Sequence, residues 1–371
     1  MNNVIVIGPD HYNTLWLVRS LGMAKMCPFV IILSPNKNSF VVKSKYCRDS
    51  VIVSNEESLL NFLMNNEFSD RQIVLSSSDG VAMFLDSYLE ILKDKYIIPN
   101  CNNKQGELSY WMNKDKMVAK AAECGLSVPK SISLTPKSFD NTTEFTFPCL
   151  IKPEQSAVAS KNDFQICHNA EELNFAITNI KDKCPSILIQ EYIKPEYEYL
   201  VYGVSTDEEI CLPGGLRKIH TCADMNNLGM MSYACLSNEI PEQIGDFEKI
   251  KEFIRAIGYK GLFSVEFLIT KEEAYFLEIN LRNDGTCYIT TQAGVNMPAL
   301  WVYSCLGKDA SKLSRVFKRQ YTYGMNEINY LKYTFSIKRL VQCIKEFVSV
   351  KAFSLIKWND MNPVIYKVFN R

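Results

Sequence analysis

Two acidic residues, Glu266 and Glu278, lie in a segment whose pattern is typical of a β-hairpin. Two strand-like runs flank three polar residues within positions 264–282. If Thr270 pairs with Ala274, the register places Glu266 directly opposite Glu278, with Cβ atoms roughly 4.5–5.5 Å apart. Facing carboxylates repel each other and weaken a sheet, so this arrangement favours a bound cation.

Magnesium suits such a pair, because Mg²⁺ takes carboxylate and amide oxygens and completes its octahedron with substrate phosphates. Side chains alternate along a strand, so Glu278, Asn280 and Arg282 share one face. The sequence therefore predicts a Mg–nucleotide site at Glu266, Glu278 and Asn280. The alternative is an ordinary amphipathic sheet face in water, and a hairpin register shifted by one residue separates the two carboxylates.

Three features upstream favour the nucleotide interpretation. Lys152 lies inside an apolar strand, where an unpaired ammonium is costly; a phosphate satisfies it, as does a buried ion pair. Glu191 ends another apolar strand and Glu198 follows it, so backbone groups there can read an adenine edge and a carboxylate can accept from ribose hydroxyls. Lys116 belongs to a basic cluster that begins a helix, a pattern most often found on a solvated face.

The elements that position these residues begin with an α/β unit over residues 1–110. Short apolar runs alternate with helical stretches, which predicts a parallel sheet with right-handed crossovers. Ligands of such sheets bind at the carboxyl ends of strands, here Gly8–Asn13 and Ser76–Gly80. His11 is the best histidine for substrate contact, although a plain loop histidine fits equally well. Asp79 is expected to cap the next helix, with a substrate role as the minority interpretation.

Beyond the first unit the sequence pattern changes twice, first in its expected secondary structure and then in its charge. Residues 148–294 alternate short β-runs with polar turns and helices, which predicts an α+β unit with antiparallel sheet. Residues 306–371 carry 13 Lys and Arg against 4 Asp and Glu, a net charge of +9 on a body of −9. We expect a terminal extension packed on the acidic body; the alternative is docking to an anionic membrane surface or a lipid-linked saccharide.

Composition limits the classes of protein that fit. The 371 residues have a formal net charge of zero, which gives no global field to recruit nucleic acid. Thirteen cysteines without a C-x-x-C pair suit a reducing compartment better than a disulfide framework or a zinc site. The apolar run at residues 4–7 is shorter than a signal peptide requires, and no apolar stretch is long enough to span a membrane. We therefore expect a cytoplasmic protein, or one peripheral at the inner membrane face.

The order and spacing of these motifs resemble the ATP-grasp superfamily over roughly residues 1–305. The similar segments are Asp115-Lys116, Leu150-Ile-Lys-Pro153, Gln190-Glu-Tyr-Ile193 with Glu198, and Glu266 followed by Glu278-Ile-Asn-Leu-Arg282. The resemblance implies a Rossmann-like pre-ATP-grasp domain at 1–110 and a two-lobed ATP-grasp domain with antiparallel sheets at 111–305. Its lobes are expected at about 111–190 and 191–305, before the basic C-terminal extension at 306–371.

The resemblance also implies a role for each matching residue. Lys116 and Lys152 neutralise the phosphates of ATP, while Glu191 and the backbone of Tyr192 and Ile193 hold adenine. Glu198 holds the ribose, and Leu268 and Leu277 pack against the base. Glu266, Glu278 and Asn280 bind Mg²⁺, which Mn²⁺ can replace. Arg282 lies beside the transferred phosphoryl group or the substrate carboxylate, where a planar cation binds in bidentate fashion.

Two departures from the family pattern affect the predicted phosphate site. The loop after Lys152 usually carries glycines whose amides close over the phosphates, but residues 154–161 contain none. Either the loop grips less tightly or Lys161 supplies the missing cation. The segment 214–218 resembles a basic segment that D-aspartate ligases present near the phosphates, which implies a catalytic role for Lys218. Ser264 replaces an arginine of the D-alanine ligase branch.

The implied activity is ligation of a carboxylate to an amine through an acyl phosphate, with release of ADP and phosphate. C-terminal runs of this kind are similar to those of ATP-grasp proteins in cell-envelope or capsule biosynthesis. A nucleotide-binding protein without ligase activity and a carboxylase that uses bicarbonate stay open as alternatives. The motifs name neither the carboxylate nor the amine, and they leave the oligomeric state open. A dinucleotide-dependent oxidoreductase is disfavoured, because the first strand lacks G-x-G-x-x-G.

Overall fold

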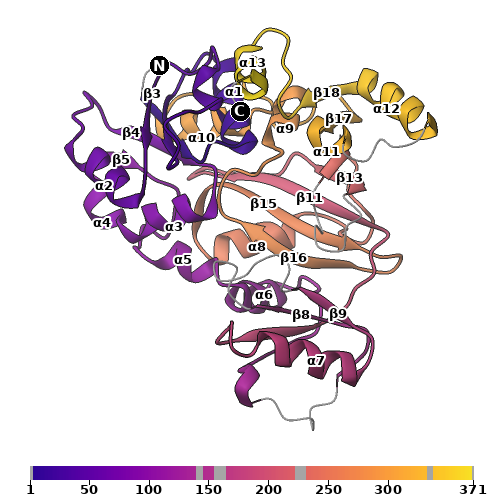
Figure 1. Cartoon of the computed structure of the whole chain (residues 1–371). Coiled ribbons are helices and arrows are strands. Elements are labelled where there is room, and N and C mark those ends of the chain that lie inside the picture. Colours follow the sequence, from indigo (N-terminus) through magenta and orange to yellow (C-terminus); the bar gives the residue numbers. More distant parts are fainter. Residues whose placement is uncertain (1–2, 139–144, 154–163, 222–230, 332–336, 370–371) are drawn as a thin grey trace.

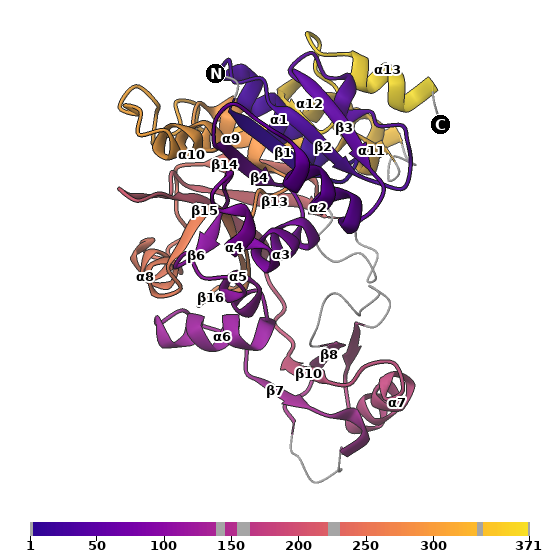
Figure 2. The ribbon, with the colours of Figure 1, turned by 90° about the vertical axis from the view of Figure 1, so that its left-hand side faces the viewer.

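The computed structural model of the protein describes residues 3–138, 145–153, 164–221, 231–331 and 337–369. These described residues form three sheets of five, four and nine strands. The five- and nine-stranded sheets lie together with the C-terminal segments, and the four-stranded sheet forms a small lobe that projects away from them (Figure 1, Figure 2).

The first sheet is parallel, with strand order β3-β2-β1-β4-β5. Its strands are β1 (Val4–Gly8), β2 (Phe29–Leu33), β3 (Asp49–Val53), β4 (Gln72–Ser76) and β5 (Tyr96–Ile97). The connecting segments hold α1 (Tyr12–Met23), the 3₁₀ turn η1 (Val41–Lys43), α2 (Glu56–Asn65), α3 (Asp79–Ser87) and α4 (Leu89–Leu92). The central strand β1 is buried along its whole length, as expected of a parallel strand covered on both faces. The helical segment after β4 is broken at Tyr88 into α3 and α4.

The small lobe is antiparallel, with strand order β7-β10-β8-β9. Its elements are β7 (Ser131–Leu134), the 3₁₀ turn η2 (Pro136–Ser138), β8 (Cys149–Pro153), β9 (Gln165–Cys167), α7 (Ala170–Ile180) and β10 (Ile187–Glu191). The apolar residues of α7 pack on β8, β9 and β10 to form a separate small core. The chain reaches this lobe through β6 (Asn100–Cys101), α5 (Glu107–Trp111) and α6 (Lys114–Glu123).

The large sheet runs β16-β15-β11-β13-β14-β17-β18, and β12 and β6 pair to its members. Its remaining strands are β11 (Tyr197–Ser205), β12 (Ile210–Cys211), β13 (Gly215–Thr221), β14 (Met231–Ser237), β15 (Tyr259–Ile269), β16 (Ala274–Asn280), β17 (Thr322–Met325) and β18 (Val350–Phe353). α8 (Glu248–Ala256) packs on one face of this sheet. α9 (Cys287–Ala293) and α10 (Met297–Cys305) pack on the other face.

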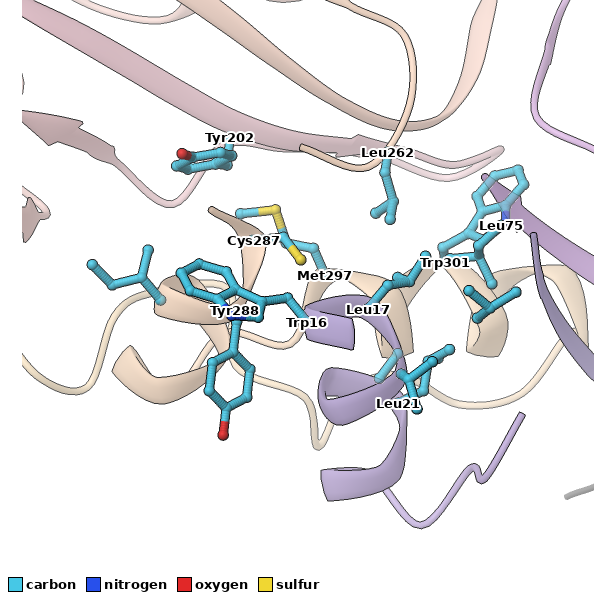
Figure 3. Close-up of a cluster of buried hydrophobic side chains, with 14 of the residues drawn as sticks. Trp16, Leu17, Leu21, Leu75, Tyr202, Leu262, Cys287, Tyr288, Met297 and Trp301 are labelled. Atoms are coloured by element: carbon cyan, nitrogen blue, oxygen red, sulfur yellow. The ribbon is translucent and has the colours of Figure 1, made fainter. Parts of the chain in front are cut away.

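One apolar core joins the parallel unit to the large sheet. Side chains of α1, such as Trp16 and Leu17, are buried against α9 and α10 and beneath Tyr202 and Leu262 of the sheet (Figure 3). The indole N–H of Trp16 donates to the carbonyl of Ser354 at 2.7 Å, which ties the same core to the C-terminal region. The two units therefore hold a fixed relation to each other, as a site built between them requires.

Residues 306–371 are integrated into the fold, which corrects the expectation of an appended extension. β17 and β18 extend the large sheet, and α11 (Glu327–Leu331), α12 (Ile337–Ser349) and α13 (Asn362–Phe369) accompany them. Arg19 of α1 and Asp360 form a fully buried ion pair at 2.9 Å. The buried carboxylate of Glu327 accepts hydrogen bonds from the backbone N–H groups of residues 354–356 and from the Ser354 hydroxyl.

Candidate functional site

Glu266 of β15 lies opposite Glu278 of β16, as the sequence predicted, but the register of the hairpin differs from the expected one. At the turn Ile269, not Thr270, pairs with Ala274, a shift of one residue. A β-bulge next to Glu266 restores the pairing, because β16 has one extra residue, Leu277, between the partners of Phe267 and Glu266.

The two faces of the hairpin differ in burial. Val265, Phe267 and Ile269 of β15 are buried in the core beneath α8, whereas Glu266 and Leu268 are half-buried on the opposite face. On β16, Leu277 and Glu278 are consecutive and both half-buried, flanked by buried Phe276 and Ile279. The bulge thus interrupts strict alternation. It lets an apolar side chain and a carboxylate share the face that Glu266 occupies.

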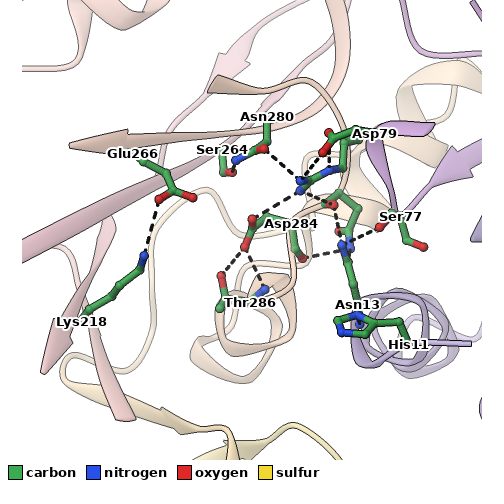
Figure 4. Close-up of polar contacts among 12 residues, drawn as sticks. His11, Asn13, Ser77, Asp79, Lys218, Ser264, Glu266, Asn280, Asp284 and Thr286 are labelled. Atoms are coloured by element: carbon green, nitrogen blue, oxygen red, sulfur yellow. Dashed lines mark hydrogen bonds and ion pairs between the residues drawn. The ribbon is translucent and has the colours of Figure 1, made fainter. Parts of the chain in front are cut away.

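Lys218 of β13 lies beside Glu266 and Glu198. Its ammonium donates to the carboxylate of Glu198. It also lies 3.5 Å from the Glu266 carboxylate (Figure 4). Burial disfavours the charged form of Lys218, but Glu266 and Glu198 outweigh it and raise the pKa of this lysine. Burial raises the pKa of Glu266 to about 7, against the attraction of Lys218 and with Glu278 adding to the rise. The carboxylates are thus crowded enough that one lysine does not fully neutralise them.

Glu278 lies near a different lysine, Lys114, which the sequence motifs did not single out. The Lys114 ammonium lies 3.7 Å from the Glu278 carboxylate. The Asn113 side chain caps α6 by accepting from the backbone N–H groups of residues 115 and 116, and Lys114 is the first residue of that helix. Lys116 is exposed and lies 5.8 Å from the Tyr110 ring centre, so the structure brings Lys114 rather than Lys116 to the carboxylates. The phosphate role of Lys116 stays a prediction.

Lys152 is buried in β8 without a carboxylate contact among the described residues. Its ammonium donates to the side-chain oxygen of Gln190 at 3.0 Å, which is a neutral partner. Burial, together with nearby Lys114, lowers the pKa of Lys152 to about 8. Among the described residues, Lys152 therefore has a neutral partner and not the buried ion pair that the sequence left open. A buried cation with only a neutral partner suits an anionic ligand.

Arg282 is held in place by a carboxylate from the parallel unit. Its guanidinium binds both carboxylate oxygens of Asp79, at 2.9 and 3.2 Å, and donates to the Asn280 side-chain oxygen at 2.9 Å (Figure 4). Asp79 was expected to cap α3, but Ser78 is the cap and accepts from the backbone N–H of Val81 at 3.4 Å. Asp79 therefore orients the arginine instead.

The carboxyl ends of β1 and β4 meet the end of β16 at this same point. The Asn13 side chain donates to the carbonyl of Ser77 at 2.7 Å and to that of Asn283 at 3.0 Å. A Cβ atom on Gly8 would lie 1.8 Å from the Ser77 hydroxyl oxygen, so only glycine permits this approach. His11 caps α1 by accepting from the backbone N–H of Asn13, and its substrate role stays a prediction.

The predicted adenine residues lie where β10 leaves the small lobe. Glu191 ends β10, and the backbone N–H of Tyr192 donates to the carbonyl of Pro148 at 3.1 Å, so that N–H is not available to a base. Ile193 is buried, while Leu268 and Leu277 are half-buried. Lys161 lies outside the described residues. These adenine and phosphate roles stay predictions.

The predicted magnesium ligands form a pair of carboxylates with one amide. Among the described residues no group of three or more His, Cys, Asp or Glu is arranged to hold a metal ion. Glu266 and Glu278 nevertheless fit a cation that also contacts a phosphate ligand, because such a cation needs only one or two protein carboxylates. A bound cation would offset both effects that raise the pKa of Glu266, first its burial and then its proximity to Glu278.

A cavity of about 660 Å³ lies next to the carboxylate cluster, and Lys218 is among its lining residues. It is lined by Tyr197, Tyr199, Arg217, Cys235 and Tyr323, among others. Tyr199 pairs with Phe267 and Arg217, so this row occupies the face of the sheet opposite Glu266. Most of the cavity therefore lies on the face of the sheet that Glu266 and Glu278 do not occupy, with Lys218 as a residue shared by both.

Comparisons with known proteins agree on one fold. A family model described as ATP-grasp in the biosynthetic pathway with Ter operon matches residues 235–329. The carbamoyl phosphate synthase large chain of Clostridium beijerinckii is 25% identical over 265 residues, which are 70% of this chain and 24% of that protein. A Clostridium botulinum large chain is 28% identical over 189 residues. This chain spans about a quarter of the length of the first of these relatives, and less of the second.

Solved structures extend the similarity to most of the chain. The carboxyaminoimidazole ribonucleotide synthase of Aspergillus clavatus, complexed with ATP, has a TM-score of 0.67 and 14% identity, covering 91% of this chain and 87% of that one. The biotin carboxylase domain of Hydrogenobacter thermophilus 2-oxoglutarate carboxylase has a TM-score of 0.66 and 14% identity, covering 87% and 73%. An L-amino acid ligase from Bacillus licheniformis has a TM-score of 0.63 and 13% identity, covering 84% and 77%.

Proposed function

We propose that this chain, which belongs to the ATP-grasp superfamily, is an ATP- and Mg²⁺-dependent ligase that joins a carboxylate to an amine through an acyl phosphate. The observation that carries the proposal is the pair of facing carboxylates, Glu266 and Glu278, each beside a lysine from another element. Buried Lys152, with its neutral partner, supplies a second place for an anion. A magnesium-bound triphosphate matches both groups, because its cation suits the two carboxylates and its phosphates suit the Lys152 ammonium.

Each site residue has a role under this proposal. Glu266, Glu278 and Asn280 would hold Mg²⁺, which neutralises phosphate charge when bound. Lys152 and Lys114 would contact phosphates, as would Lys116 and Lys161. Glu191, the carbonyl of Tyr192 and the backbone of Ile193 would hold adenine between Leu268 and Leu277. Glu198 would accept from ribose, and Lys218 would keep Glu198 and Glu266 charged and oriented. Residues 1–110 would serve as the pre-ATP-grasp domain, with His11 and Arg282 at the substrate.

The chemistry requires positioning more than covalent participation by the protein. A substrate carboxylate oxygen attacks the γ-phosphorus of ATP, and ADP leaves as the bond to its β-phosphate oxygen breaks. The amine nitrogen then attacks the acyl carbon, phosphate leaves, and the amine loses a proton to give the amide. Arg282 fits the first step, because its guanidinium is held in a fixed orientation by Asp79 and can bind a carboxylate or the transferred phosphoryl group. The acyl phosphate must be shielded from water, as closure of the small lobe would do.

Bicarbonate is a second candidate for the carboxylate. A similar structure named above is a biotin carboxylase domain that contains MgADP and bicarbonate. With bicarbonate the same first step would give carboxyphosphate, and a nitrogen nucleophile would then be carboxylated. A further alternative is a protein that binds nucleotide without ligase activity, for which we expect ATP binding without phosphate release. An envelope or capsule pathway for the reaction remains part of the proposal and rests on the cationic C-terminal residues.

A phosphate-release screen tests the proposal. Purified protein is incubated with ATP, Mg²⁺ and a matrix of amino acids, sugar acids and bicarbonate, each with and without amines. Glu278→Gln should abolish any release that the screen finds. Glu272→Gln, at an exposed residue in the turn of the same hairpin, is the matched control and should retain it. Release that persists in Glu278→Gln, or ATP binding with no release in any combination, contradicts the ligase proposal.

A further inference from the structure

α12 presents an apolar stripe to solvent and turns its one acidic residue, Glu346, toward the protein. Ile337, Ile344 and Val348 are 84%, 58% and 77% exposed, and Val341 is half-exposed between them. These four positions follow the spacing i, i+4, i+7, i+11, so they form one stripe along the helix. An amphipathic helix of a globular protein normally turns such a stripe toward the core, but the described residues leave this stripe uncovered, as a docking surface would be.

The polar side of α12 is firmly attached. The buried carboxylate of Glu346 accepts hydrogen bonds from the Tyr330 hydroxyl and from the side-chain amide of Gln342, and it pairs with His220 of β13. The Ser349 hydroxyl contacts the Tyr233 hydroxyl at 3.2 Å. Rotating the helix to bury its apolar stripe would break these contacts and leave a carboxylate without partners. The exposed stripe is therefore the stable arrangement of this helix on the protein.

Charge indicates what covers the stripe. Lys338 and Lys345 are seven residues apart, so both lie on one flank of the stripe, and both are exposed. Glu346, the single acidic residue of the helix, is buried. Two copies of the chain packed through this stripe would bring four lysines together with no exposed acid on either helix to offset them. An anionic surface matches this pattern better than a second copy does.

We propose that α12 lies flat on an anionic lipid surface, with its apolar stripe among the acyl chains and its lysines at the headgroups. The helix has 13 residues and is therefore about 20 Å long, which suits a position in the plane of the interface. No helix among the described residues is long and apolar enough to cross a bilayer. The combination of a cationic flank and an apolar face provides the two attractions that stable peripheral binding requires.

The position of α12 in the molecule is compatible with such docking. α12 and α13 lie at the end of the molecule opposite the small lobe and α7 (Figure 1, Figure 2). α13 adds exposed apolar residues at that end, among them Phe369 at its last turn. A bilayer at this end leaves the small lobe free to move over the carboxylate cluster.

Vesicle co-sedimentation of the full chain tests the proposal. The protein should bind vesicles of mixed phosphatidylglycerol and phosphatidylcholine, weakly at high salt, and it should bind pure phosphatidylcholine far less. Ile344→Glu should lower the partition coefficient by about tenfold or more, because it removes apolar contact and adds negative charge. Lys338→Gln with Lys345→Gln should lower it by roughly tenfold. All of these side chains are exposed, so the variants should fold normally; a truncation at residue 306 would instead remove strands of the large sheet.

Matched controls come from the opposite end of the molecule. Phe175→Glu replaces a residue of α7 that is 65% exposed, and Lys181→Gln with Lys183→Gln removes two exposed lysines next to it; both should bind like the parent. Unchanged binding of Ile344→Glu, or equal binding to neutral vesicles, overturns the proposal. So does a lipid-free dimer in sedimentation velocity that Ile344→Glu abolishes, because the stripe is then an interface between copies. Phosphate release is measured separately, so this proposal and the ligase proposal fail independently.

Discussion

Glu266 of β15 pairs with Glu278 of β16. They do so although the strand pairing next to the turn, Ile269 with Ala274, is shifted by one residue from the register that a regular hairpin would need. The extra residue, Leu277, compensates for the shift in the turn. β-bulges commonly redirect side chains next to functional sites. The bulge at Leu277 keeps the two carboxylates opposed and places an apolar side chain beside them. The pairing costs stability, since like charges directly opposite each other weaken a sheet.

Replacing one of the two carboxylates should therefore stabilise the protein while removing its activity. For Glu278→Gln we expect the free energy of unfolding without ligand to rise by about 0.5–1 kcal/mol, since the repulsion is lost and the contact with Lys114 is partly solvated. The increase in melting temperature on adding Mg–ATP should disappear. Thermal denaturation with and without ligand measures both effects. A destabilised variant that still responds to Mg–ATP would contradict the interpretation.

The hairpin also shows which features could be predicted from the sequence and which could not. Alternating apolar and polar residues identified both strands and the opposed carboxylates, because those depend on local pattern. The turn register and the bulge could not be predicted, since they depend on how Phe267, Phe276 and Ile279 fit the core beneath α8. Lys114 was missed because three lysines lie within the first seven residues of α6, and the position of the cap at Asn113 decides which one reaches Glu278.

Lys218 should be essential to the folded state as well as to the site. Lys218→Met keeps the unbranched side chain, one heavy atom shorter, but leaves the carboxylates of Glu198 and Glu266 without their buried cation. We expect a loss of about 3 kcal/mol in the free energy of unfolding, measured with chemical denaturant. Adding Glu198→Gln should recover part of this loss, because it removes one uncompensated charge. Equal losses in the single and double variants would show that packing, not charge, explains the effect.

Asp79 should act on catalysis rather than on stability. Asp79→Asn breaks the bidentate contact with Arg282, but the carboxylate is half-exposed, so we expect less than about 1 kcal/mol of destabilisation. Phosphate release should fall by about tenfold or more, because Arg282 loses the partner that orients it. Asp70→Asn, an exposed residue of the same unit, is the control and should leave both properties unchanged. Steady-state kinetics and thermal denaturation together separate the two effects.

Glu327 tests the integration of the C-terminal residues. Its carboxylate accepts from three backbone N–H groups and a hydroxyl, and Glu327→Gln turns one acceptor oxygen into a donor that faces them. We expect about 2–3 kcal/mol of destabilisation in denaturant unfolding. Glu239→Gln, on the rim of the cavity, should change stability by less than about 0.5 kcal/mol. An unaffected Glu327→Gln would mean that the C-terminal region contributes little to the fold.

Sequence reasoning failed for this region because its contacts are distant along the chain. Arg19 and Asp360 are 341 residues apart, and neither lies in a motif. β17 and β18 have four residues each and belong to the large sheet only through pairing with β14. The excess of Lys and Arg in residues 306–371 indicates the charge of their surface. It carries no information on the buried contacts that join them to the rest of the fold.

Lys152 should make nucleotide binding depend on pH near 8. Its pKa is lowered to about 8 by burial, so in the free protein it loses its proton as the pH rises through that value. The positive charge that a phosphate needs is therefore present below pH 8 and absent above it, and affinity for Mg–ATP should fall as the pH rises from about 7 to 10. Stability without ligand should change in the opposite direction. The unfolded chain holds this proton up to a pKa near 10.5, so stability rises with pH between about 8 and 10.5.

Calorimetric titrations of Mg–ATP across this pH range measure the dependence. Lys152→Met should bind more weakly at pH 7 and should lose the step near pH 8, whereas Lys104→Gln, at an exposed lysine of the first unit, should keep it. A second observable comes from the proton itself: binding above pH 8 should take up a proton, which titrations in buffers of different ionisation enthalpy detect. If Lys152→Met keeps the step, another group titrates there, and Lys152 does not contact the phosphates.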